Sequence, residues 1–131
     1  MSIHKSIGHL YYGDDHKLIV QIDQGISDYY RSLIPKHMEV SSPMWPAHIT
    51  VVRTQKEIPT NLQFWKKYDY QPIEFYYSSI IDWDETYYWL DVYCKQLEFI
   101  RKELGLSNVS QYTLPPSGFK KVFHTTIGNK K

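Results

Sequence analysis

The sequence predicts an α+β domain built from two similar halves. Each half contains a hairpin of apolar strands, then a helix, then a strand that carries the pattern His-x-Thr. The strands show apolar residues at a period near two, whereas the helices show them at three- and four-residue spacing. Helices mixed with antiparallel strands in this way are typical of α+β domains. The repeated order indicates an internal pseudo-repeat that spans the chain.

The first half is read from its apolar runs and its turn residues. Residues 13–15 are Gly-Asp-Asp, a turn-forming cluster that separates two apolar runs and predicts a hairpin. Asp23 suits the N-cap of the following helix, and Pro35 ends that helix. The expected elements are strands at 7–12 and 17–23, a helix at 24–34 and a strand at 47–53.

The second half repeats this order after one additional helix. The polar turn at 82–85 separates two strands, and Gly105 provides a C-terminal stop for the helix that follows them. The expected elements are a helix at 61–68, strands at 73–81 and 87–93, a helix at 95–104 and a strand at 121–127.

Bulk composition limits the functions that are plausible. A chain of 131 residues fits a single domain, 1–131, that can bury a core without disulfides or metals. The net charge of +1 argues against a general polyanion binder, so long nucleic acid is not an expected partner. Cys94 is the single cysteine, which excludes an intrachain disulfide and fits a reducing cytoplasm. No signal peptide or membrane span is visible, and we expect a cytoplasmic protein without a membrane partner.

The two His-x-Thr patterns are the strongest candidates for chemistry. In a strand, residues i and i+2 point to one face, so His48 projects with Thr50 and His124 projects with Thr126. If the halves pack about a pseudo-two-fold axis, these four side chains meet across one cleft. One imidazole can then accept a proton and the other can donate one. The Thr hydroxyls can hydrogen-bond the non-bridging oxygens of a phosphodiester, and the set needs no metal.

These motifs resemble the signature of the 2H phosphoesterase superfamily. The resemblance covers most of the chain in element order, but only the two motifs are specific. It implies a bilobal fold in which two pseudo-symmetric halves with antiparallel sheets form a central cleft and helices lie outside. It further implies a metal-independent phosphodiesterase without a cofactor, whose catalytic residues are His48, Thr50, His124 and Thr126.

Residues 29–36 and 46–53 are similar to a phage branch of this superfamily, the anti-CBASS proteins, which destroy the cyclic oligonucleotide signals of bacterial defence. This likeness implies a ligand that is a cyclic di- or trinucleotide, cleaved at 3′,5′ bonds in the host bacterial cytoplasm. It also implies that Tyr12 and Trp83, at the ends of predicted strands, hold a base. The alternative is that Tyr12 is an ordinary strand aromatic and Trp83 a surface turn residue.

Two other functions remain open from the sequence. One is an RNA-end enzyme that acts on 2′,3′-cyclic phosphates or 2′,5′ linkages, and the other is a cyclic-nucleotide sponge that binds without cleaving. Four cations are candidates for the approach to a phosphate, with solvated surface charge as their alternative: Lys36, Arg53, Lys120 and Lys121. The remaining His residues show no metal-ligand spacing, so no metal site is expected. The oligomeric state is left open.

Overall fold

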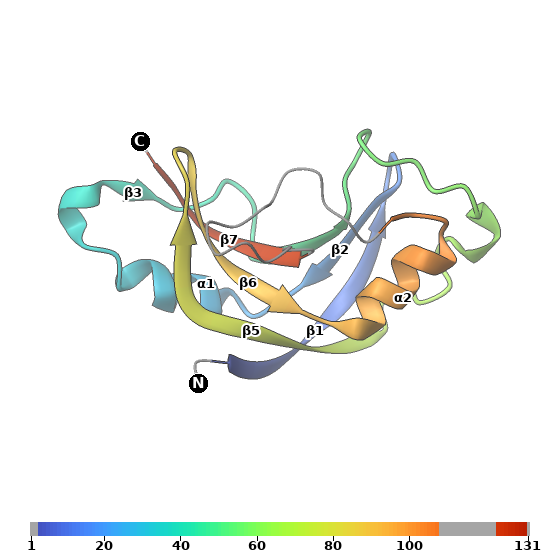
Figure 1. Cartoon of the computed structure of the whole chain (residues 1–131), viewed down its shortest axis with the longest axis horizontal. Coiled ribbons are helices and arrows are strands. Elements are labelled where there is room, and N and C mark those ends of the chain that lie inside the picture. Colours follow the sequence, from blue (N-terminus) through green and yellow to red (C-terminus); the bar gives the residue numbers. More distant parts are fainter. Residues whose placement is uncertain (1–2, 108–122, 131) are drawn as a thin grey trace.

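The computed structural model of the chain describes residues 3–107 and 123–130. Its strands form a strongly curled sheet, with the two helices towards opposite ends of the molecule (Figure 1). The elements in chain order are β1 (Ile3–Gly13), β2 (Lys17–Gln21), α1 (Gln24–Ser32), η1 (Lys36–Met38), β3 (Val40–Ser41), β4 (His48–Val52), η2 (Leu62–Phe64), β5 (Pro72–Trp83), β6 (Tyr87–Tyr93), α2 (Lys95–Glu103) and β7 (Phe123–Lys130), where η denotes a short 3₁₀ helix.

The described strands form one antiparallel sheet, whereas the resemblance implied a sheet in each half. Their order is β3-β7-β6-β5-β1-β2-β4. Apart from the two-residue β3, this order is symmetric about its centre: β1 pairs with β5, then β2 and β6 follow outward, then β4 and β7. The order of strands in the sheet therefore reflects the repeat of hairpin and third strand in the sequence, and the α+β class is confirmed.

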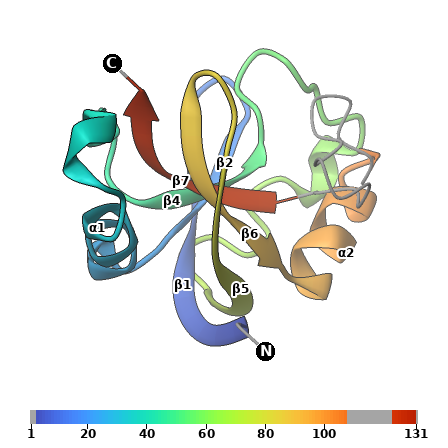
Figure 2. The same ribbon diagram turned by 60° about the vertical axis from the view of Figure 1, so that its left-hand side comes forward.

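Each helix packs on strands of the other half of the chain. From α2, the buried residues Leu97, Ile100 and Leu104 join a core made largely by β1, β2 and β4. From α1, Tyr30 joins a smaller core with Tyr88, Leu90 and Ile127. Figure 2 shows α1 and α2 on opposite sides of the strands. This exchange of helices ties the two halves together, because removing either helix would expose the apolar face of the other half.

The helix boundaries follow from local signals in the sequence. The Asp23 carboxylate accepts a hydrogen bond from the Gly25 N–H at 2.9 Å, so the predicted N-cap of α1 is confirmed. Gly105 follows α2 with a φ of 82°. Its N–H donates to the Lys102 carbonyl at 2.9 Å, and a Cβ there would lie 2.0 Å from the Thr60 hydroxyl oxygen. Glycine is therefore required both by the conformation and by the close approach.

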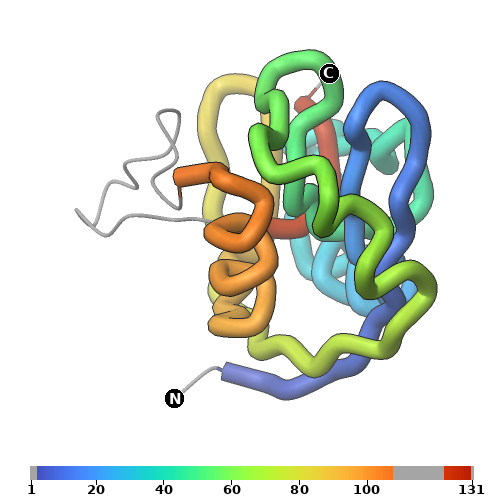
Figure 3. The backbone as a smooth tube through the Cα atoms, turned by 90° about the vertical axis from the view of Figure 1, so that its right-hand side faces the viewer, coloured from blue at the N-terminus to red at the C-terminus, as the bar shows by residue number. Residues whose placement is uncertain are grey.

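The expected helix at 61–68 is wrong. This segment contains only the 3₁₀ turn η2, and positive φ angles at Lys66 and Tyr70 interrupt any longer helix. Instead, the segment between β4 and β5 covers one side of the molecule (Figure 3), and its Phe64 and Trp65 pack against the larger core. The last strand also runs further than expected, to Lys130, while positions 121–122 of the expected strand lie outside the described residues.

Candidate active site

The curl of the sheet brings together the two strands that carry His-x-Thr. β4 is an edge strand and β7 lies near the opposite edge, yet Cα atoms of these strands approach within 8 Å. Figure 2 shows β4 and β7 beside each other across the middle of the molecule. The β1–β2 and β5–β6 hairpins rise on either side of them (Figure 1). The two motifs, 76 positions apart in the sequence (124 minus 48), thus lie in strands that are close together in space.

Both motifs present their His and Thr away from the core. In β4, His48 and Thr50 are partly exposed and the intervening Ile49 is fully buried. In β7, His124 and Thr126 are likewise partly exposed around a buried residue. The expectation that each His shares a face with its Thr is therefore confirmed.

The orientation of the His48 ring is set by the backbone beside it. Its Nδ1 lies 2.8 Å from the carbonyl oxygen of Pro46. Since a carbonyl can only accept, Nδ1 carries the proton in this contact, and Nε2 of a neutral ring then has a free lone pair. The preceding residue is also held in place, because the Ala47 N–H donates to the Gln24 side chain at 2.8 Å. Nε2 is thus positioned to accept a proton.

The second motif has a carboxylate beside its histidine. Asp91 of β6 is the cross-strand partner of His124, and Trp89 is the partner of Thr126. The Trp89 indole N–H donates to Asp91 at 3.1 Å, and its ring lies edge-on to the His124 ring at 6.3 Å. At the equivalent place in the first half, the partner of His48 is the uncharged Gln21. The two histidines therefore lie in electrostatically different surroundings.

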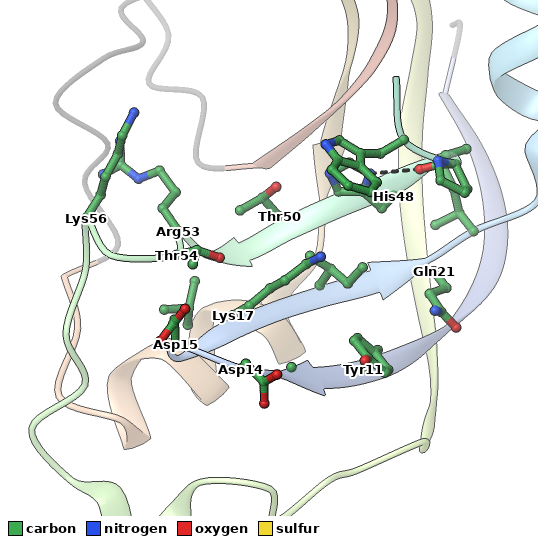
Figure 4. A pocket seen from close by; sticks show the side chains of 17 residues that line it. Tyr11, Asp14, Asp15, Lys17, Gln21, His48, Thr50, Arg53, Thr54 and Lys56 are labelled. Carbon is green, nitrogen blue, oxygen red and sulfur yellow. Dashed lines mark hydrogen bonds between the residues drawn. The ribbon is translucent and has the colours of Figure 1, made fainter. Parts of the chain in front are cut away.

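A pocket of about 910 Å³ opens beside the first motif. It lies between the β1–β2 hairpin, the residues that precede β4 and the loop that follows β4 (Figure 4). Besides His48 and Thr50, its lining includes Tyr11, Lys17, Gln21, Trp45, Arg53 and Lys56. Aromatic rings and cations next to a histidine suit a ligand that carries both bases and phosphates.

Tyr12 and Trp83, the residues expected to hold a base, do not line this pocket. Tyr12 is 6% exposed, packs edge-on against Trp65 at 4.9 Å, and has a pKa that burial raises to about 12. Trp83 is exposed but is the cross-strand partner of the buried Tyr88, so it points to the face opposite the motifs. The pocket is instead lined by Tyr11, the immediate neighbour of Tyr12.

The four cations that were candidates for the approach to a phosphate differ in where the structure places them. Arg53 lines the pocket, whereas Lys36 lies on the exposed turn η1 and does not line it. Lys120 and Lys121 fall outside the described residues. Within residues 3–107 and 123–130, no three His, Cys, Asp or Glu side chains are grouped so that they could hold a metal ion.

An arginine from each helix holds the strand of each motif. Arg101 of α2 donates to the Val51 carbonyl at 2.6 Å, and Arg31 of α1 donates to the Ile127 carbonyl at 3.1 Å. In both cases the carbonyl belongs to the residue directly after the motif threonine. Each arginine therefore reaches from a helix of one half of the chain to the motif strand of the other half. The two contacts fix the backbone next to each motif threonine. Sequence reasoning missed both arginines, and the only available signal was an arginine in the last turn of each helix.

The Arg101 contact is part of a buried ion pair. Its guanidinium donates to both carboxylate oxygens of Glu57, at 2.9 and 2.6 Å, and the Arg53 N–H donates to the same carboxylate at 3.1 Å. Burial raises the pKa of Glu57, but the hydrogen bonds outweigh burial and lower this pKa from its usual 4.5 to about 2. The loop that brings Arg53 to the pocket is thereby fixed to α2.

Comparisons with family models, with curated proteins and with solved structures find no match to this chain. In the described part of the chain, no helix is long and apolar enough to span a membrane. The case for a function therefore depends on the geometry of the two motifs and on the pocket beside them.

Proposed function

We propose that the protein is a metal-independent phosphodiesterase of the two-histidine type, with His48, Thr50, His124 and Thr126 as its catalytic residues. The observation that carries this proposal is the close approach of β4, an edge strand, and β7, which lies next to the opposite edge in the sheet order. Strands that lie close together can present both His-x-Thr pairs to one phosphate. The symmetric strand order also supports the bilobal architecture that the motifs imply.

The proposed reaction is attack by a ribose 2′-hydroxyl on the adjacent phosphorus. The 2′ oxygen forms a bond to phosphorus while its proton passes to one histidine. The P–O5′ bond breaks, and the other histidine gives a proton to O5′. The product is a 2′,3′-cyclic phosphate, and Thr50 and Thr126 donate hydrogen bonds to the non-bridging oxygens as charge develops on them. Neither an oxidant nor a cofactor is required.

We assign His48 as the base and His124 as the acid. The contact of His48 Nδ1 with the Pro46 carbonyl leaves Nε2 ready to accept the proton of the nucleophile. His124 is the cross-strand partner of Asp91, whereas the partner of His48 is the uncharged Gln21, so the anion that would balance an added proton lies on the His124 side.

The proposed substrate is a cyclic di- or trinucleotide with 3′,5′ linkages, of the kind used as a second messenger in bacterial defence. An open pocket with aromatic and cationic walls next to His48 supports a ligand of this composition. The near-neutral net charge supports a small ligand over long RNA. In this proposal, the biological role is to counter CBASS signalling on behalf of a phage.

Replacing the 2′-hydroxyl tests this mechanism. With EDTA present throughout, 3′,3′-cyclic dinucleotides should be opened to products that end in a 2′,3′-cyclic phosphate, because the catalytic groups come from side chains. The 2′-deoxy analogues should bind without being cleaved, because they lack the nucleophile. Chromatography separates the substrates from the products.

Three outcomes would contradict the mechanism. Cleavage of the deoxy analogues at the ribose rate would indicate attack by water, and activity that is lost in EDTA and restored by Mg²⁺ or Mn²⁺ would indicate a metal-dependent reaction. Binding of the ribose dinucleotides without any turnover would identify a sponge.

A further inference from the structure

The pocket beside His48 extends to the side of β4 that is away from the second motif. In the sheet, β2 flanks β4 on one side, whereas β7 approaches β4 on the other. A phosphate shared by the two motifs would lie between β4 and β7. Lys17 belongs to β2, so a phosphate bound by its amine is displaced sideways from the shared position. The pocket therefore offers space for a second part of the ligand.

Lys17 and Trp45 lie together within this pocket. The Lys17 amine is 5.7 Å from the centre of the Trp45 ring. Lys17 is the first residue of β2, at the end of this strand that lies nearer Val52. Its side chain extends along β2 towards the end of the strand that pairs with His48 (Figure 4). Trp45 precedes His48 by three positions and is 66% exposed. A large exposed ring beside a cation is suited to stack a base and to neutralise the phosphate attached to it.

The backbone around Trp45 is held to the rest of the fold. Ala47 donates to the Gln24 side chain at 2.8 Å and accepts from the Ile22 N–H at 3.3 Å. The chain is therefore anchored to the rest of the fold at Ala47, two positions after Trp45 and directly before His48. Tyr11, partly buried on β1, adds a second ring to the same pocket.

The charges around the pocket place the phosphate near Lys17. Arg53 and Lys56 line the end of the pocket beyond β4, and Asp14 and Asp15 lie at the tip of the β1–β2 hairpin (Figure 4). Arg53 is engaged with Glu57, at 3.4 Å through its Nε. The two aspartates disfavour an anion at the tip, whereas the described residues that line the pocket around His48 and Trp45 include no carboxylate.

We infer that this pocket is a subsite for a second nucleotide of the substrate, in which Trp45 stacks the base and Lys17 binds the non-scissile phosphate. This inference rests on the proposed function, since it takes the two motifs as the site of the scissile phosphate. It restricts the substrate to molecules with at least two phosphates. A cyclic mononucleotide would occupy the motifs and leave the subsite empty.

Calorimetry with uncleavable ligands tests the subsite independently of turnover. The probes are the 2′-deoxy 3′,3′-cyclic dinucleotides that contain two adenines, two guanines, or one of each. The protein should bind at least one of them, and Lys17→Met and Trp45→Ala should each weaken that binding roughly ten- to a hundredfold. Binding of 3′,5′-cyclic AMP and 3′,5′-cyclic GMP should change by less than about threefold in both variants, because these ligands do not reach the subsite.

Matched substitutions outside the pocket serve as controls. Lys36→Met and Trp83→Ala remove the same kinds of side chain from exposed positions that do not line the pocket, and they should leave the affinity for dinucleotides unchanged. Equal losses for mononucleotides and dinucleotides in the Lys17 and Trp45 variants would overturn the subsite, as would unchanged dinucleotide binding. Failure of the protein to bind any dinucleotide would also overturn it. Dinucleotide binding that behaves as predicted, without hydrolysis of the ribose forms, would keep the subsite and reject the proposed catalysis.

Discussion

His48→Ala is expected to lower kcat/KM for a ribose cyclic dinucleotide by about 10²–10⁴-fold, because a general base contributes on this scale. His124→Ala should cause a similar loss on the same substrate. The two variants should differ on uridine 3′-(4-nitrophenyl phosphate), since nitrophenolate leaves without a proton. On this substrate His124→Ala should retain most of its activity, whereas His48→Ala should remain impaired. Steady-state rates of nitrophenolate release provide the measurement.

Both substitutions lie on the partly exposed face of the sheet, so the fold should tolerate them. Circular dichroism and thermal unfolding of each variant provide the control for folding. If the nitrophenyl substrate rescues His48→Ala and not His124→Ala, the assigned roles are reversed. If both folded variants cleave the dinucleotide at the wild-type rate, the motifs are not the active site.

Arg101→Met is expected to reduce the free energy of unfolding by about 3–5 kcal/mol, the usual cost of removing one partner from a buried ion pair. The side chains of Arg101 and Glu57 are only 8% and 14% exposed, so the carboxylate would be left without its partner in a poorly hydrated place. The substitution also removes the donor to the Val51 carbonyl. Urea unfolding at neutral pH measures the loss. Arg31→Met is the matched control and should cost less, because its partner Asp28 is 53% exposed.

The same ion pair predicts how stability depends on pH. The pKa of Glu57 falls on folding from 4.5 to about 2, so its contribution is complete above about pH 5 and is lost as the pH falls through 2. A shift of this size corresponds to about 3 kcal/mol. Arg101→Met and Glu57→Gln should both flatten this part of the stability profile. An acid dependence in Glu57→Gln equal to that of the wild type would show that other carboxylates cause it.

The sequence was sufficient to predict the features that depend on local patterns. The N-cap at Asp23, the stop at Gly105, and the presence of a hairpin, a helix and a His-x-Thr strand in each half could be predicted because turn chemistry and apolar period act over a few residues. The pairing of each His with its Thr on one face could be predicted for the same reason. The α+β class follows from the same patterns.

The sequence was not sufficient for features that depend on register and tertiary packing. A strand end does not reveal which of two neighbouring aromatic residues faces the pocket, and a shift of one position separates the buried Tyr12 from the pocket residue Tyr11. The apolar residues of 61–68 are compatible with a helix in the sequence. In the structure this segment is mostly irregular, and its apolar side chains pack against the core. The exchange of helices between the halves, and with it the role of Arg101, depends on contacts between distant segments.

The central claim, that the two motifs form one site for one phosphate, is tested most directly by a crystal structure with a bound 2′-deoxy cyclic dinucleotide. This ligand lacks the nucleophile and should persist in the crystal. We expect one of its phosphates to lie within hydrogen-bonding distance, about 2.6–3.2 Å, of His48, Thr50, His124 and Thr126 together. A ligand whose phosphates contact one motif alone, or neither, would contradict the claim.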